Sequence, residues 1–148
     1  MALSWEQFQA TVKARAILNF PEPILKTPDP HYFICIGLSP DNELVLSCCT
    51  SQFETVKNLV ERNRYPASTL VYIPKTHADN PFKKDTYINC NEYFQYTMGE
   101  LWAMYNKGQL SFHGELPLDS FDQILTGFRD SDQIEDELKD TLPTIDDF

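Results

Sequence analysis

The fold is decided by residues 31–50, whose sequence is HYFICIGLSPDNELVLSCCT. Two runs of β-forming residues, 31–37 and 43–50, enclose the turn cluster Ser39-Pro40-Asp41-Asn42. Two such runs around a short polar loop are typical of a β-hairpin. Both runs are apolar almost throughout, as strands covered on both faces are. We therefore expect this hairpin to form the buried centre of a sheet.

Outward from the hairpin, hydrophobic spacing predicts the other elements. Apolar residues at every third or fourth position indicate helices over 5–16, 53–63, 97–108, 118–128 and 131–142. Runs rich in β-branched and aromatic residues indicate strands over 68–73, 86–90 and 110–114. Side chains that can cap a helix stand near several helix starts, namely Ser4, Thr97, Asp119 or Ser120, and Ser131. Residues 144–148 are expected to be frayed.

The predicted elements favour an α+β fold. The hairpin comes early and helices gather towards the C-terminal end, an order that argues against a parallel α/β fold. We expect a compact antiparallel sheet of about four to six strands, curled into a small barrel. The proline-rich segment 21–30 is expected to be extended, either as a linker or along a sheet edge.

A chain of 148 residues has the usual size of one domain. We divide the expected single domain, 1–148, into an N-terminal helix within 1–20, a barrel core over 30–128 and an acidic segment over 129–148. The formal net charge is −10, and eight of the 22 acidic residues lie in the last segment. Such a segment is usually a solvated tail, although it can also shield a basic site or mimic a nucleic acid. The global charge by itself disfavours strong nucleic-acid binding.

Several classes of chemistry lack their sequence signatures. The chain contains no glycine-rich phosphate loop, no H-E-x-x-H and no G-x-S-x-G motif. The three histidines are far apart and the four cysteines show no C-x-x-C spacing, so we predict no metal site and no cofactor. The cysteines lie in apolar runs and are interpreted as buried thiols in a reducing compartment. No stretch reaches the roughly 20 apolar residues that span a bilayer, which predicts a cytoplasmic protein without membrane contact.

Polar residues at the ends of the hairpin are the first candidates for a site. His31 begins the first strand, where it can act as a general acid or base or serve a structural role. Thr50, Ser51 and Gln52 follow the second strand, where hydroxyl groups and helix amides can bind a phosphate. The simpler interpretation of these hydroxyl groups is a helix cap.

Basic residues supply the second set of candidates. Lys83 and Lys84 precede a predicted strand and would suit contacts to an RNA backbone. Arg62 and Arg64 stand beside Tyr65, a combination that can bind and stack on unpaired bases. All four cations are equally compatible with an ordinary solvated surface.

Residues 30–52 resemble the core hairpin of the MazF/PemK family of RNA-cleaving toxins. The shared features are an apolar strand after a proline, a loop, and a second apolar strand that ends in Cys49-Thr50-Ser51-Gln52. Residues 107–118 and the helix at 121–128 are similar to the closing strand and the C-terminal helix of that family. The resemblance thus covers about residues 30–128.

The resemblance implies a small barrel that commonly forms a homodimer, cleaves single-stranded RNA without a metal and has a protein partner such as an antitoxin. It places Thr50, with Ser51 beside it, at the family's catalytic threonine. The family's arginine has no clean counterpart, and His31 lies nearest to its place, so Lys83 or Lys84 would supply the positive charge. The expected function is a metal-independent endoribonuclease of a toxin–antitoxin or defence system. The alternative is a non-catalytic protein-interaction module on the same fold, bound through its acidic segment.

Overall fold

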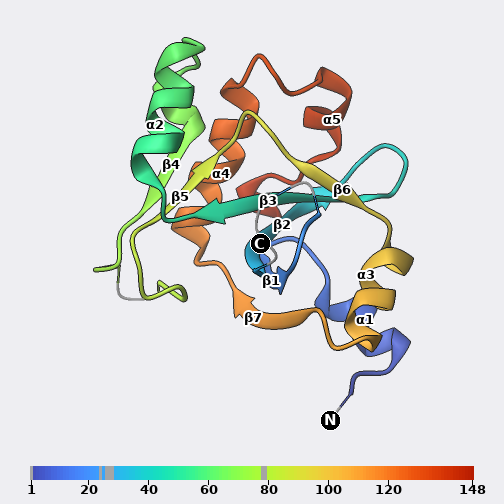
Figure 1. Ribbon diagram of the computed structural model, residues 1–148. Coiled ribbons are helices and arrows are strands. Elements are labelled where there is room, and N and C mark those ends of the chain that lie inside the picture. Colours follow the sequence, from blue (N-terminus) through green and yellow to red (C-terminus); the bar gives the residue numbers. More distant parts are fainter. Residues whose placement is uncertain (1, 24, 26–28, 78–79) are drawn as a thin grey trace.

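A computed structural model describes residues 2–23, 25, 29–77 and 80–148 (Figure 1). Its helices are α1 (Trp5–Thr11), α2 (Phe53–Arg62), α3 (Met98–Asn106), α4 (Leu118–Asp130) and α5 (Asp136–Thr141), with short 3-10 helices η1 (Ala67–Thr69) and η2 (Ile145–Asp147). Its strands are β1 (Ala16–Phe20), β2 (His31–Leu38), β3 (Leu44–Thr50), β4 (Leu70–Ile73), β5 (Thr86–Asn89), β6 (Phe94–Tyr96) and β7 (Ser111–Glu115). Residues 24 and 26–28 of the predicted extended segment lie outside the described residues.

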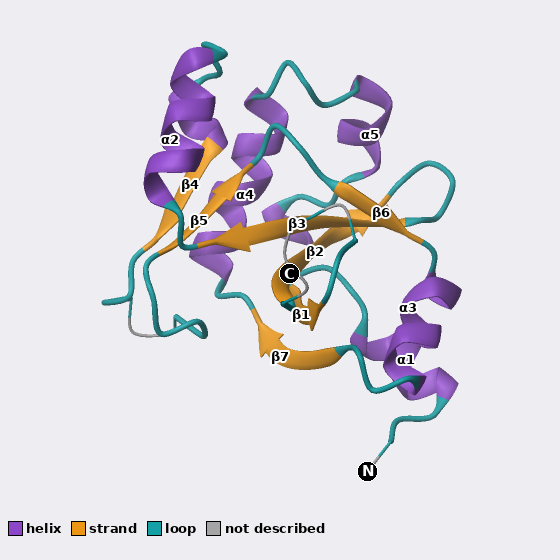
Figure 2. Cartoon of the chain, in the orientation of Figure 1, coloured by secondary structure: helices purple, strands orange, loops and turns teal. Residues whose placement is uncertain are grey.

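The strands form one antiparallel sheet with the predicted hairpin at its centre (Figure 2). Its order is β4-β5-β3-β2-β1-β7, and β6 pairs with the first half of β3. In the hairpin, Phe33 of β2 lies opposite Cys48 of β3, and Ile34 lies opposite Ser47. The prediction of an α+β fold built on an antiparallel sheet is confirmed. β6, which is only three residues long, was not predicted.

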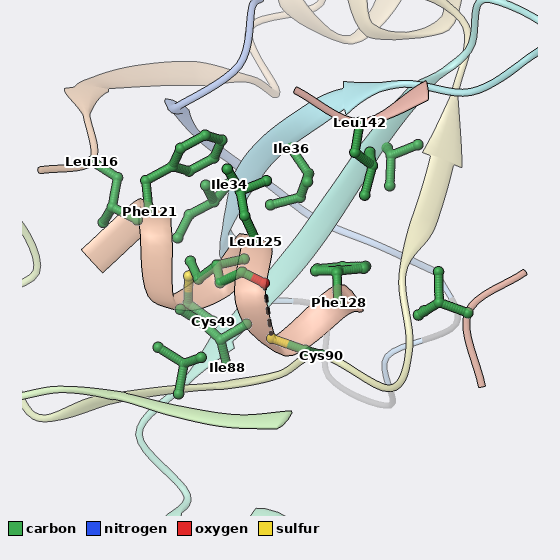
Figure 3. Packing of buried hydrophobic residues seen from close by; sticks show 14 of the residues in the cluster. Ile34, Ile36, Cys49, Ile88, Cys90, Leu116, Phe121, Leu125, Phe128 and Leu142 are labelled. Atoms are coloured by element: carbon green, nitrogen blue, oxygen red, sulfur yellow. Dashed lines mark hydrogen bonds between the residues drawn. The ribbon is translucent and has the colours of Figure 1, made fainter. Parts of the chain in front are cut away.

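The central strands are buried on both faces, as their continuous apolar sequence predicts. Ile34 belongs to one core, which it shares with Phe121 of α4 (Figure 3). Its neighbour Phe33 belongs to the opposite core, with Phe8 of α1 and Leu101 of α3. Because successive side chains of a strand point to opposite faces, helices on both sides of the sheet require apolar residues at every position of the hairpin.

The sheet does not close into the predicted barrel. β4 forms one edge and β7 the other, and no pairing joins these two edges among the described strands. β4 and β5 lie between α2 and α4 (Figure 1). Helices therefore cover this part of the sheet, which in a closed barrel would face the opposite wall. The core beside β4 and β5 is sealed by side chains of α4 such as Phe128. The architecture is therefore an open sheet with helices on both faces.

The predicted N-terminal helix is too long. α1 ends at Thr11, and residues 16–20 form β1, which pairs with both β2 and β7. The chain turns at Arg15, whose φ of 78° lies in the left-handed region. The helical spacing was misleading because Val12 and Ala16 are both buried beside Phe8, but Ala16 reaches that core from a strand.

Two of the predicted helix caps are confirmed. Ser4 and Thr97 each form a capping box with the residue three places later. The predicted cap at Asp119 or Ser120 is wrong, because α4 begins directly after Pro117 and has no side-chain cap at that end.

The acidic segment 129–148 is part of the core rather than a solvated tail. Ile134, Leu138 and Leu142 are buried in the same core as α4. Ser131, predicted to start a helix, instead follows α4, and its hydroxyl donates to Asn91 Oδ1 at 2.6 Å. The following helix, α5, begins only at residue 136. Apolar side chains at these positions fix the segment while its acidic side chains face solvent.

The last residues are also ordered, contrary to the prediction of a frayed end. Thr144 and Asp147 form a capping box at η2. The Phe148 ring lies edge to face with Phe121, with centroids 5.4 Å apart, and Arg15 lies over it at 5.8 Å. The C-terminal end is therefore attached to α4 and to the turn before β1.

Candidate functional site

A cavity of about 370 Å³, here called the hairpin cavity, opens where β2 begins and β3 ends. It brings together five of the predicted site residues, which come from three separate parts of the chain: His31, Thr50, Ser51, Gln52 and Lys84. The rest of the lining is made by Pro30, Tyr32, Cys49, Phe82 and Thr86.

The antiparallel register accounts for the meeting of His31 and Thr50. The hairpin pairs Phe33 with Cys48, and the same register continued to the end of the strands sets His31 across from Thr50. Both residues are half-buried. On its other side, Thr50 is paired with Tyr87 of β5. These two site residues are therefore held at strand ends, which position side chains more rigidly than loops do.

Thr50 also organises the turn that leads from β3 into α2. Its Oγ1 accepts a hydrogen bond from the Gln52 backbone N–H at 3.0 Å, and the Ser51 carbonyl accepts one from the Phe53 N–H at 3.1 Å. α2 begins after Gln52 without a side-chain cap, so the hydroxyl stabilises a local turn rather than the helix itself. Among the described residues, no acceptor receives the Thr50 hydroxyl proton, which leaves this O–H available to a ligand.

A loop held by Asn80 brings Lys84 and Phe82 to the cavity. The Asn80 amide donates to the carbonyls of Pro74 at 2.7 Å and Lys84 at 3.0 Å, and its Oδ1 accepts the Phe82 N–H at 2.7 Å. The Thr86 hydroxyl donates to the same Lys84 carbonyl at 3.1 Å. The Lys84 backbone is thus fixed, while its side chain is exposed and makes no ion pair with any described residue.

Aromatic side chains form one wall of the cavity, and sequence reasoning missed them. Tyr32 and Phe82 meet edge to face with ring centroids 5.2 Å apart, and the His113 ring lies 5.0 Å from Tyr32. Tyr32 stands in an apolar run that indicated only core packing. The available signal was Phe82 itself, a large aromatic residue directly before two lysines in a loop; part of this side chain packs against the core that contains α4.

The lining of the hairpin cavity includes no carboxylate among the described residues, while Lys84 lies at its edge. Three further cavities each contain at least one acidic residue, respectively Glu22 with Glu100, Asp147, and Glu115. The chain has 22 acidic and 12 basic residues, so a cavity without an acid departs from the composition of the molecule. An anionic ligand is the kind that such a cavity favours.

Cys49 lies in the lining but is not suited to act as a nucleophile. Burial raises the pKa of its thiol well above the ordinary value of 9.0, so the reactive thiolate is scarce at neutral pH. The neighbouring Cys48 has a pKa raised to about 12, chiefly by burial and further by Glu92 and Glu22. The chemistry of the site therefore rests on imidazole, hydroxyl and ammonium groups.

The other predicted cations lie away from the cavity. Arg62 is the last residue of α2, and Arg64 follows it with a φ of 58°. α2 starts beside the cavity at Phe53, and its 10 residues extend about 15 Å, which places both arginines at the far end. Lys83 is exposed, with a φ of 58°, and does not line the cavity.

Two further properties bear on the kind of site. Within the described ranges, no three His, Cys, Asp or Glu side chains gather as a metal site requires. None of the helices in the described part of the chain is long and apolar enough to cross a bilayer.

No protein-family model matches the sequence, and no curated protein shows significant similarity to it. The interpretation of the hairpin cavity therefore depends on its own geometry.

Proposed function

We propose that the chain is a metal-independent endoribonuclease that cleaves single-stranded RNA at the hairpin cavity, as the toxin-like component of a toxin–antitoxin or defence system. One observation carries the proposal. A proton-transfer group, a hydroxyl group and a cation, namely His31, Thr50 and Lys84, line one cavity whose described lining contains no acid.

The proposed reaction is an internal phosphoryl transfer. The 2′-hydroxyl oxygen of one nucleotide attacks the adjacent phosphorus, and the bond between phosphorus and the 5′-oxygen breaks. The 2′-hydroxyl group loses a proton and the departing 5′-oxygen gains one, so the products are a 2′,3′-cyclic phosphate and a 5′-hydroxyl end. A protein can promote this step without a metal if it supplies a proton acceptor, a proton donor and positive charge.

The residues of the cavity suit these roles. The His31 imidazole can take the proton of the 2′-hydroxyl group and pass it to the departing 5′-oxygen, and the Thr50 hydroxyl can donate a hydrogen bond to a non-bridging phosphate oxygen. Lys84 would stabilise the charge that builds up on the phosphate in the transition state. Ser51 and Gln52, exposed on the turn after β3, are placed to orient the same phosphate.

The neighbouring lysines provide a matched test of this assignment. We expect Lys84→Ala to slow cleavage of a single-stranded RNA pool by about 100-fold, at the lower end of the roughly 100- to 1000-fold losses seen when one charge-stabilising donor is removed. Lys83→Ala removes the same charge from outside the cavity and should change the rate only slightly. Equal losses in the two variants would contradict the proposed site, because they would indicate a diffuse charge effect.

A second candidate function is a non-catalytic interaction module, and one observation favours it. α5 buries Leu138 in the core, while Glu135, Asp136, Glu137 and Asp140 are exposed around it. Such a surface suits a basic protein partner. If RNA remains intact, Glu137→Lys with Asp140→Lys should abolish capture of a partner from a lysate, whereas retained capture would exclude α5 as the binding surface.

A further inference from the structure

A row of aromatic rings continues from the hairpin cavity across the edge of the sheet. Thr50 of β3 is paired with Tyr87 of β5, and Tyr87 is paired with Tyr72 of β4. Directly paired residues lie on the same face of a sheet, so the three side chains form one line that begins at the cavity. The rings of Tyr72 and Tyr87 are stacked, with centroids 5.1 Å and planes 13° apart. Phe53, at the start of α2, contacts the Tyr87 ring at 4.9 Å.

The outer rings of this row are exposed to solvent. Tyr72 is 46% exposed and Phe53 is 38% exposed, whereas Tyr87 between them is half-buried. β4 is an edge strand, so no described strand covers Tyr72 from beyond it. Core packing therefore accounts for Tyr87 but not for the position of Tyr72.

The Tyr72 ring is held in a fixed orientation. Its hydroxyl donates to Asp85 Oδ1 at 3.0 Å, and the same oxygen accepts the Lys75 N–H at 2.8 Å. A ring that is already fixed loses little conformational entropy when a ligand binds to it.

Cations accompany the row along its length. Lys57 Nζ lies 5.7 Å from the centroid of the Phe53 ring, the charge of Lys75 is close enough to help lower the pKa of the Asp85 carboxylate beside Tyr72, and Lys84 borders the hairpin cavity. Flat aromatic faces with nearby cations, leading to a cavity without acids, match the chemistry of single-stranded nucleic acid. A stacked pair of rings that leads to such a cavity suits the flat bases of a nucleic acid better than the side chains of a protein partner.

We propose that Tyr72 and Tyr87 form a base-stacking subsite for the nucleotides next to the phosphate in the hairpin cavity. This inference rests on the proposed function, because the cavity provides the phosphate position from which the row extends. Stacking on aromatic rings is tolerant of base identity, so the subsite would hold single-stranded RNA without choosing its sequence. It replaces the arginines at the far end of α2 as the main contact to bases.

Binding to an uncleavable probe tests the inference separately from catalysis. The probe is a short, fluorescently labelled 2′-O-methyl oligonucleotide of mixed sequence, whose blocked 2′-oxygen prevents cleavage. We expect Tyr72→Ala to raise its Kd about tenfold, in line with the loss of one stacked base. Tyr72→Phe, which keeps the ring but loses the hydroxyl that fixes its orientation, should raise the Kd clearly less than Tyr72→Ala does. An oligonucleotide that lacks bases should bind the native protein and the Tyr72→Ala protein equally.

The outcomes separate the two proposals. An unchanged Kd for Tyr72→Ala would overturn the stacking subsite, even if the native protein cleaves ordinary RNA. A tenfold higher Kd of Tyr72→Ala for the oligonucleotide that carries bases, with an unchanged Kd for the one that lacks them, would support the subsite. This holds even if ordinary RNA stays intact and the nuclease proposal fails. Absence of any probe binding by the native protein would overturn the subsite as well. Tyr72 is exposed on an edge strand, and circular dichroism with thermal unfolding would verify that each variant is folded.

Discussion

Gly127, in the middle of α4, is fixed by close packing rather than by backbone conformation. A Cβ atom at this position would lie 2.7 Å from Cys90 Sγ and 2.9 Å from the Ser68 carbonyl oxygen. In an open helix the change from glycine to alanine stabilises the protein by about 1 kcal/mol. Here the Ser68 carbonyl oxygen cannot move aside easily, so the change from glycine to alanine at position 127 should destabilise the protein.

We expect Gly127→Ala to lower the free energy of unfolding by about 1–3 kcal/mol, the usual cost of overpacking a core. Urea unfolding followed by circular dichroism measures this change. Gly99→Ala in α3 is the matched control, since the nearest atom to its new Cβ, Thr97 Oγ1, is 3.9 Å away. That control should leave stability unchanged or raise it. Equal stability of the Gly127→Ala and native proteins would show that α4 can shift away from Cys90 and η1.

At the scale of single residues, the sequence identified those site residues that a hairpin register brings together. His31 and Thr50 can be placed at the same end of a sheet as soon as the strands and the turn between them are known. Lys84 also lines the cavity, but its partners in the loop, above all Asn80, gave no local signal. Tyr72 and Tyr87 were missed because their pairing joins two strands that the sequence could not align.

At the scale of elements, a hydrogen bond connects the loop after β4 to the start of α4. His77 Nε2 and Asp119 Oδ2 are 2.8 Å apart on the protein surface. The bond with His77 is the main reason that the pKa of Asp119 lies below its ordinary value of 3.8, and the Ser120 N–H lowers the pKa further. The ionised carboxylate is therefore favoured more in the folded chain than in the unfolded one.

The sign of the pH dependence follows from that lowered pKa. The stabilisation is present above the ordinary value of 3.8 and is lost as the pH falls through the lower folded value. We expect Asp119→Asn to flatten the decrease in unfolding free energy below about pH 4, by less than about 1 kcal/mol because the pair is exposed. Urea unfolding across a pH series measures this decrease, and His77→Ala should give most but not all of the same flattening, because the Ser120 N–H still lowers the pKa of Asp119. If the unfolding free energies of the native protein and of Asp119→Asn decrease in parallel below about pH 4, Asp119 does not have the lowered pKa proposed for it.

Elements with strong and separate signals were predicted correctly, and the errors arose where two elements adjoin. The helix beginning at Trp5 was extended into β1 because buried residues of both elements share one core. The start of α5 was placed too early because Ser131 has the side chain of a cap but uses it to bind Asn91. In both cases a tertiary contact determined the boundary, and local propensity did not.

At the scale of the whole molecule, the acidic segment contributes to stability. Leu138 is 3% exposed and lies in the core shared with α4. We expect Leu138→Ala to lower the free energy of unfolding by about 2–5 kcal/mol, as large-to-small core changes do. Glu137→Ala, on the exposed side of the same helix, should change it by less than about 0.5 kcal/mol.

Thermal or urea unfolding of these two variants distinguishes a core element from an attached tail. If both variants unfold like the native protein, the segment contributes little to the core. If Leu138→Ala destabilises the protein as expected, deletion of residues 130–148 cannot test whether this segment shields the site, because the deletion would remove part of the core.

The overall class could be predicted from the sequence, whereas the closure of the sheet could not. The hairpin residues 31–50 specify antiparallel strands covered on both faces, and that requirement is met either by a barrel or by helices. Here α4 and α5 cover one face and α1 and α3 the other. The choice depends on which helices reach the sheet, a property of the long-range packing that local spacing does not encode.

The central claim is that the hairpin cavity cleaves RNA without a metal. The most direct measurement is end-group analysis of single-stranded RNA after incubation with purified protein in EDTA, beside the His31→Ala, Thr50→Ala and Thr50→Ser variants. We predict 2′,3′-cyclic phosphate and 5′-hydroxyl ends from the native protein, loss of products with both alanine variants, and partial retention with Thr50→Ser. Intact RNA at high protein concentration, or cleavage that persists in the alanine variants, would contradict the claim.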